Sequence, residues 1–395
     1  MTLNLAAVGK QIRAMAENAA SMEQRSEKQL REALAAMERC PDQFNELRQR
    51  IESSRTAWPI ARPLASPKGR WPLPLCPSDY TVIASDGSQI DPDRHGPVLC
   101  YLINVGTATL RYGAQPGANL ESEAVLGYEE QDLYITYRGR RMLVEGHVLD
   151  GRRGLLESKR LAEKAVCEAA KGPTVAVQDG TLLLRTVEGW GDDYVLELYL
   201  EEFLDCLEQM RQHRVAVCSY ISRPRSVDVV NLLRLLQCPH PIANCDVLCP
   251  DLAQRDAQPC GQLAGLLDGT VYHHWLSSGQ RSAVFLSPSP VSLKRYEDHR
   301  VCFFYANVGR EVARIEVPEW VARNEDHLDL VHAVLYEQCQ RGGGYPRALI
   351  EAHEKAVISG AERQQFQDLL EASLVRRGIQ RRPSEKQRSK RLRGL

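Results

Sequence analysis

The pattern of apolar and polar positions divides the chain into a helical start, a proline-rich stretch and a region of alternating strands and helices. Residues 1–57 alternate charged and apolar positions at helical spacing without sustained heptads, which predicts a helical arm. Residues 58–78 are rich in proline, which fixes φ and lacks a backbone donor, so this segment is predicted to be a surface linker. A single domain is therefore expected over residues 79–375.

Within that domain the order of elements is informative. Three apolar, β-branched runs at residues 80–87, 96–106 and 107–113 predict antiparallel strands, and residues 114–150 are polar and irregular. Three predicted helices, 152–170, 192–212 and 226–237, then alternate with two buried strands, 174–180 and 215–222. The resulting order, βββαβαβα, predicts an α/β fold with a ribonuclease-H-like mixed sheet, a helical N-terminal arm and C-terminal helices.

Composition places the chain among ordinary globular proteins, with 43% hydrophobic and 26% charged residues in 395. No apolar run approaches 18 residues and the start lacks a signal-peptide pattern, so a cytoplasmic location is expected. The net charge of -1 offers no overall attraction to nucleic acid. Residues 376–395 form a basic tail, which is either a solvated terminus or a contact for DNA or a partner protein.

Two aspartates share the same local sequence, because Asp86 in ASDGSQ and Asp179 in VQDGTL each follow a buried strand and precede glycine and a hydroxyl residue. Each pair alone is typical of a turn. In the predicted fold, however, these two strands are neighbours, so the carboxylates would converge. Two carboxylates that lie so close together repel each other unless a divalent cation lies between them. The pattern therefore predicts a metal site.

A third acidic ligand is expected on the helix between these strands. Glu157 and Glu163 are six residues apart and cannot both face the site. The helical wheel slightly favours Glu163, which borders the apolar stripe, and Glu157 has a structural alternative as the surface partner of Arg153, four residues earlier. The residues alone leave this choice open.

A cysteine-rich loop spans residues 238–260. It holds Cys238, Cys245, Cys249 and Cys260, with His240 alongside, and the spacing matches neither a zinc ribbon nor a ferredoxin. In a cytosolic chain these thiols are not expected to form disulfides. They are either ordinary buried thiols or the ligands of a second metal centre, zinc or an iron–sulfur cluster. Such a centre would order a loop that has few apolar side chains.

The sequence resembles the NurA nucleases, which act beside the HerA translocase in DNA end resection. The resemblance covers roughly residues 79–375 and rests on SDGSQ, RRGLLE, QDGTLL, YISRPRSVDVVNLLR, CFFYANVG, ARIEVPEWV and YPRALIEAHEKAVIS, in this order. It implies that Asp86, Glu157 and Asp179 match the family's acidic motifs and bind manganese or magnesium. Tyr345 and His353 match the C-terminal motif, where the family places polar groups near the site.

The resemblance further implies a DNA nuclease with 5′-to-3′ activity, a HerA-type hexameric partner and a homodimer. A pair of metals would activate water and stabilise the leaving oxygen, with His353 donating a proton or contacting phosphate. Arg223 and Arg225 either contact the DNA backbone or cap the preceding strand. Two other readings stay open: a noncatalytic scaffold subunit of a DNA translocase, and an RNA-directed ribonuclease H relative. Polarity, strand preference and exonuclease or endonuclease character do not follow from the sequence.

Overall fold

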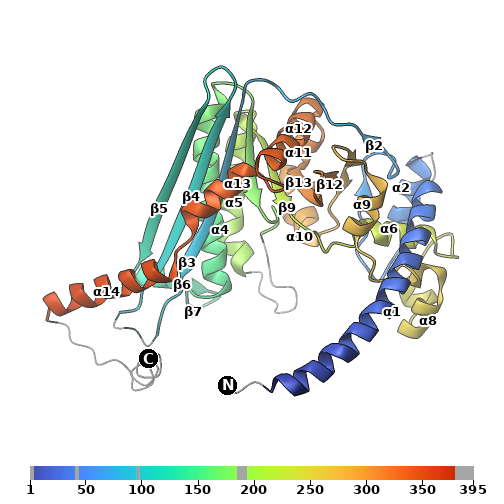
Figure 1. Cartoon of the computed structure of the whole chain (residues 1–395), viewed down its shortest axis with the longest axis horizontal. Helices are drawn as coiled ribbons and strands as arrows, with labels where there is room; N and C mark the ends of the chain where they lie inside the picture. Colours follow the sequence, from blue (N-terminus) through green and yellow to red (C-terminus); the bar gives the residue numbers. More distant parts are fainter. Residues whose placement is uncertain (1–3, 41–43, 95, 97, 185–193, 379–395) are drawn as a thin grey trace. The chain divides into compact units, whose positions relative to one another are not determined.

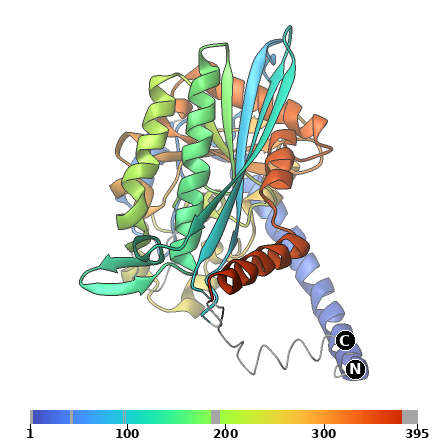
Figure 2. The same cartoon turned by 90° about the vertical axis from the view of Figure 1, so that its left-hand side faces the viewer.

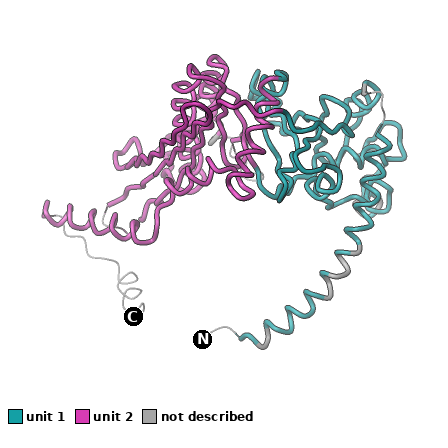
Figure 3. The backbone as a smooth tube through the Cα atoms, turned by 45° about the horizontal axis from the view of Figure 1, so that its top comes forward, with its two compact units in different colours: residues 1–74, 221–325 teal, residues 75–220, 326–395 magenta. Residues whose placement is uncertain are grey.

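The computed structural model describes residues 4–40, 44–94, 96, 98–184 and 194–378. These residues divide into two compact units, which are coloured separately in Figure 3: unit 1 comprises residues 1–74 and 221–325, and unit 2 comprises residues 75–220 and 326–395. Residues 379–395 of the predicted basic tail lie outside the described part, and the predicted domain limits stay a prediction. Within the described ranges, no helix combines the length and apolar character needed to cross a bilayer.

Unit 2 is built round a mixed sheet. Its elements are β3 (Tyr80–Ile90), β4 (Tyr101–Tyr112), β5 (Gly117–Gly127), α3 (Glu130–Leu133), β6 (Tyr134–Tyr137), β7 (Arg140–Leu143), α4 (His147–Ala169), β8 (Thr174–Asp179), α5 (Tyr194–Gln212), β9 (Ala216–Ile221), α12 (Glu325–Arg341), α13 (Arg347–Ala356) and α14 (Gly360–Arg376). The strand order is β9, β8, β3, β4, β5. The first three strands along the chain pair antiparallel, whereas β8 and β9 join in parallel. The ribonuclease-H-like mixed sheet is therefore confirmed.

The predicted limits of the second and third strands are wrong. Residues 101–112 form one unbroken strand, β4, in which Gly106 pairs with Asp86 instead of turning the chain. The third strand is β5, in the stretch expected to be irregular. Most of its residues are exposed, so it lacks the apolar alternation by which a strand is recognised. The β6–β7 hairpin in the same stretch was missed because it also lacks apolar alternation.

Helices cover both faces of this sheet. Figures 1 and 2 show α4 and α5 side by side on one face and α13 on the other. The predicted apolar stripe of α4 is buried at Leu155 and Ala162. At the far end of α4 the carboxylate of Glu168 accepts two hydrogen bonds from the Arg111 guanidinium on β4, at 2.6 and 2.7 Å. This partly buried ion pair connects the end of α4 to the sheet.

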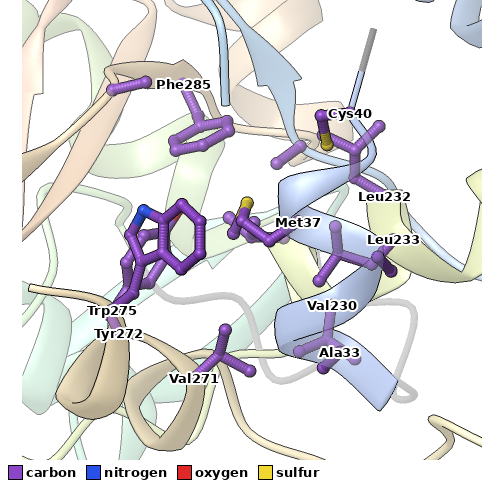
Figure 4. Packing of buried hydrophobic residues seen from close by; sticks show 14 of the residues in the cluster. Ala33, Met37, Cys40, Val230, Leu232, Leu233, Val271, Tyr272, Trp275 and Phe285 are labelled. Carbon is purple, nitrogen blue, oxygen red and sulfur yellow. The ribbon is translucent and has the colours of Figure 1, made fainter. Parts of the chain in front are cut away.

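Unit 1 has its own strands and a helical core. Its elements are α1 (Leu5–Glu38), α2 (Phe44–Ser53), β1 (Arg62–Pro63), β2 (Arg70–Trp71), α6 (Asp228–Leu236), α7 (Cys245–Leu248), α8 (Leu252–Ala257), η1 (Pro259–Gly261), α9 (Asp268–Trp275), β10 (Arg281–Ser282), β11 (Phe285–Leu286), α10 (Pro290–Arg295), η2 (Glu297–His299), β12 (Val301–Asn307), β13 (Val312–Pro318) and α11 (Glu319–Ala322). Met37 of α1 packs among Leu233, Tyr272, Trp275 and Phe285 in the core shown in Figure 4. The last helix of the predicted βββαβαβα order, α6, belongs to this unit.

The segment expected to be a surface linker contributes two short strands. β1 pairs antiparallel with β11, and β2 pairs antiparallel with β10. Pro63 is tolerated in β1 because that strand lies at the end of the sheet, where a missing N–H breaks no ladder. Proline content alone therefore did not distinguish an edge strand from a linker.

Replacement of Glu168 by glutamine should destabilise the protein in a pH-dependent way. Hydrogen bonds from Arg111, followed by those from Lys171, lower the pKa of Glu168 to about 2. Because the folded-state pKa lies below the unfolded value of about 4.5, the ionised side chain stabilises the fold above pH 4.5, and this contribution is lost as the pH falls toward 2. We expect Glu168→Gln to lower the free energy of unfolding by about 1 to 2 kcal/mol at pH 7.

Denaturant unfolding at pH 7 and pH 3 measures this difference, with Glu163→Gln on the same helix as the matched control. Glu163 forms an exposed pair with Arg160, so its replacement should change stability by less than about 0.5 kcal/mol. Equal effects of the two substitutions at pH 7 would contradict the role assigned to Glu168.

Candidate functional site

The register between β3 and β8 sets the two aspartates side by side. The two strands run parallel, and their last aligned pair is Ser85 with Gln178. Asp86 and Asp179 are the next residues on the two strands, and paired residues of a parallel sheet point to the same face. Burial raises the pKa of Asp179, and electrostatic repulsion from Asp86 adds to this shift. The predicted convergence of the two carboxylates is therefore present in the structure.

Asp86 does not end its strand, contrary to the expectation from the Asp-Gly dipeptide. β3 continues to Ile90, and Asp86 pairs with Gly106 of β4. The glycine after Asp179 does serve a turn, because Gly180 has a φ of +84°. Gly87 instead makes room, since a Cβ there would lie 2.4 Å from Oε1 of Glu157.

Helix α13 and the turn before it bring a histidine and a tyrosine to the aspartates. The hydroxyl of Tyr345 donates a hydrogen bond to Oδ1 of Asp179 at 2.8 Å. The Nδ1 atom of His353 lies 2.6 Å from Oδ2 of Asp86. Gly106 permits this approach, because a Cβ on β4 would lie 2.3 Å from a carbonyl oxygen of α13. The sequence placed both residues near the site without indicating which aspartate each contacts.

Two polar side chains that the sequence reasoning overlooked hold the end of α13 in place. Ser88 and Asn104 both donate to the carbonyl oxygen of Ala356, the last residue of the helix. They satisfy a helix-end carbonyl that has no partner within the helix.

Glu157 reaches the site from the other face of the sheet. Strand residues alternate between faces, so Ser85 and Gly87 face α4 while Asp86 faces α13. The Ser85 hydroxyl donates to the backbone carbonyl of Glu157 at 3.0 Å. The Glu157 side chain is only 13% exposed, and Nε of Arg153 lies 3.2 Å from its Oε1. The missing side chain of Gly87 lets this carboxylate lie against the strand beside Asp86.

Glu163 lies elsewhere, so the helical-wheel preference for it is wrong. Its side chain is 55% exposed and pairs with Arg160 at 2.7 Å. The wheel considered only the apolar stripe of α4, whereas the buried face of the helix is wide enough to include Glu157. Between the two glutamates left open by the sequence, Glu157 is the one that lies with the aspartates.

Burial and crowding of negative charge dominate the electrostatics of the site. Burial raises the pKa of Glu157 to about 7, and repulsion from Asp86 and Asp179 adds to this effect. The nearby Arg153 opposes the shift without cancelling it. Three carboxylates therefore share a region whose positive charge is insufficient to keep all of them ionised at low energetic cost.

This donor set suits a hard divalent cation in charge and in chemistry, because carboxylate oxygens are the ligands that magnesium and manganese prefer. Each carboxylate is engaged by a protein partner: Asp86 by His353, Asp179 by Tyr345 and Glu157 by Arg153. As they stand, no three histidine, cysteine, aspartate or glutamate side chains among the described residues are arranged to hold a metal ion. Metal binding would have to exchange these partners for the ion.

Comparison with known proteins identifies the family. The model of the NurA domain matches residues 80–358, a range that contains the three carboxylates, Tyr345 and His353. The chain belongs to the NurA family. This is a nuclease family. A crystal structure of NurA with manganese is similar to this chain at 13% sequence identity and a TM-score of 0.31, over 80% of this chain and 92% of that one. No curated protein matches the chain.

The NurA domain match also contains the two arginines predicted to contact DNA. Arg223 and Arg225 follow β9 in unit 1, and both are exposed. Arg223 has a φ of +44°, a conformation that is unfavourable for a residue with a side chain. Their role in DNA binding stays a prediction.

The cysteine-rich loop is likewise inside the NurA domain, and it gathers its thiols. Burial raises the pKa of Cys260, and the other three cysteines of the loop add to the shift, so all four are near one another. They do not form a ligand set in the described structure. The thiols therefore lie close together, but the predicted zinc or iron–sulfur centre is not formed as they stand.

Replacement of Glu157 by glutamine should stabilise the metal-free protein at neutral and alkaline pH. The folded-state pKa of about 7 lies above the ordinary value of 4.5, so ionisation of Glu157 makes the native state less stable as the pH rises from about 4.5 through 7. Glutamine removes this charge. We expect the variant to exceed the wild type by about 2 to 3 kcal/mol at pH 8 and to equal it at pH 4.

Thermal and denaturant unfolding in the presence of a chelator measure the difference, and Glu163→Gln again supplies the matched control. A Glu157→Gln variant that is less stable than the wild type at pH 8 would contradict the electrostatic account of the site.

Proposed function

We propose that this chain is a divalent-metal-dependent DNA nuclease whose metal ligands are Asp86, Glu157 and Asp179. The observation that carries the proposal is the meeting of these three carboxylates with Tyr345 and His353 at the carboxyl end of β8, beside the neighbouring strand β3. A purely structural role gives no reason for a buried, unfavourably charged glutamate beside two aspartates. Membership of a nuclease family rests on the match to the NurA domain.

The three carboxylates would hold manganese or magnesium, which supplies Lewis-acid activation of water and of the scissile phosphate. Asp86 orients the ring of His353 by accepting a hydrogen bond from Nδ1. Nε2 is then the atom that takes or gives a proton, and the ring is 63% exposed, so a substrate can reach it. Tyr345 positions the carboxylate of Asp179 through its hydroxyl. Both residues are proposed to shape the site around the ions.

The more detailed parts of the proposal rest on the NurA family alone. These are 5′-to-3′ end resection in double-strand break repair, partnership with a HerA-type hexameric translocase, a homodimeric assembly and a cytoplasmic location. Exposed Arg223 and Arg225 are proposed as contacts to the phosphate backbone, which would make binding sensitive to salt.

Loss of either aspartate should abolish cleavage without unfolding the chain. Purified protein is incubated with 5′- and 3′-labelled duplex and single-stranded DNA, and with a matched RNA–DNA hybrid, in manganese, magnesium or EDTA. We expect metal-dependent cleavage of DNA by the wild type and a reduction of at least about 100-fold in Asp86→Asn and Asp179→Asn, because each removes a charged ligand.

Glu163→Gln removes a nearby but exposed carboxylate and should retain wild-type activity. Cleavage by the aspartate variants at the wild-type rate would exclude these residues as ligands. An inactive wild type with every metal would favour the scaffold subunit, and selective cleavage of the hybrid would favour a ribonuclease H relative.

Gly87 provides a second test, because its role is to make space for a ligand. An added methyl group would displace the Glu157 carboxylate, whose Oε1 lies 2.4 Å from the position of a Cβ. We expect Gly87→Ala to fold and to lose at least about tenfold in cleavage rate, since small displacements of positioning groups have effects of this size.

The matched control is Gly154→Ala, because a Cβ at Gly154 of α4 meets nothing within 4 Å. This variant should cleave at the wild-type rate. A fully active Gly87→Ala protein would mean that the position of Glu157 against β3 is unimportant for the reaction.

A further inference from the structure

The loop at residues 238–260 brings four thiols to one small cavity in unit 1, and the proposed nuclease site uses none of them. Cys238, Cys245, Cys249 and Cys260 all line this cavity, together with Trp58. The space open to a water-sized sphere is about 10 Å³, enough for roughly one small occupant. The four thiols thus share a pocket of atomic size despite their irregular spacing in the sequence.

The thiols come from separate short elements. Cys245 begins α7 and Cys249 directly follows the end of this helix, with its backbone N–H donating to the carbonyl of Cys245 at 3.3 Å. Cys238 follows the end of α6, and Cys260 lies in η1. Three of the four are buried, and Cys238 is partly buried. A common ligand would therefore connect three segments that the backbone leaves independent.

Arginine side chains contact the backbone at each of the four cysteines. Each of the four cysteine carbonyls accepts a hydrogen bond from an arginine, and three arginines make all of these contacts. Arg50 donates to Cys238 at 3.0 Å, Arg255 to Cys249 at 2.6 Å and to Cys245 at 3.4 Å, and Arg234 to Cys260 at 2.8 Å. Guanidinium groups at these positions would stabilise the excess negative charge of a four-thiolate metal centre.

Of the aliphatic side chains in this loop, Ala243 is buried, but three larger ones are not. Ile242, Val247 and Leu248 are exposed instead of packed. A bound metal contributes folding free energy directly and can replace a core in a segment of this kind.

We propose that Cys238, Cys245, Cys249 and Cys260 bind a thiolate-coordinated metal centre, zinc or an iron–sulfur cluster, that holds this loop in its fold. In the described structure the thiols do not form a ligand set, so binding draws them together round the cavity. Each S–H bond is replaced by a sulfur–metal bond and its proton passes to water, without oxidation or reduction. The centre is structural and does not depend on the proposed nuclease activity.

Metal analysis of the full chain, purified without oxygen, tests the proposal. We expect either about one zinc per chain or iron with an equal amount of acid-labile sulfide, which distinguishes the two kinds of centre. Cys249→Ser should lower this content at least about tenfold, whereas Cys167→Ser, which removes an exposed thiol of α4, should leave it unchanged. Wild-type protein with neither zinc nor iron in stoichiometric amounts would overturn the proposal.

Cobalt titration keeps the test decisive if Cys249→Ser does not fold. Co²⁺ added to metal-free wild-type protein should produce a sulfur-to-metal charge-transfer band that zinc abolishes by competition. Carboxylate ligands give no such band, so the result is independent of the aspartate site. Absence of the band in folded wild-type protein would also overturn the proposal, whatever the outcome of the DNA cleavage assays.

Discussion

The parallel pairing of β3 with β8 is the constraint on which the site depends. It aligns Ser85 with Gln178 and therefore sets Asp86 and Asp179 beside each other on the same face of the sheet. The buried residues before them fix this register, because a shift by one residue would turn every side chain to the wrong face. Two carboxylates are thus held close by the hydrophobic core, in spite of their mutual repulsion.

The two faces of the sheet make different contributions to the site. Helix α13 lies on the face of the aspartates and supplies His353 as a hydrogen-bond partner. Helix α4 lies on the other face and supplies Glu157, which reaches the aspartates only because Gly87 has no side chain. Arg153 compensates part of the charge of this glutamate. A cation that entered the site would relieve the repulsion that remains.

The sequence predicted the elements with a strong apolar pattern. It did not predict an exposed edge strand, or a buried side chain whose position depends on a residue in another element. The order of strands and helices and the closeness of Asp86 to Asp179 followed from apolar runs. β5 was missed because an exposed edge strand carries few apolar residues. The wheel favoured Glu163 because it measures distance from an apolar stripe, whereas the position of Glu157 depends on a glycine in another element. That dependence has no signal in a single sequence.

The central claim is that Asp86, Glu157 and Asp179 jointly hold the catalytic metal. Anomalous X-ray diffraction from crystals of the protein soaked in manganese tests it most directly, because the anomalous signal locates the ion independently of the protein atoms. The account predicts a manganese peak bonded to carboxylate oxygens of all three residues, with Arg153 displaced from Glu157. A manganese peak at a different set of side chains, or one that excludes Glu157, would contradict it.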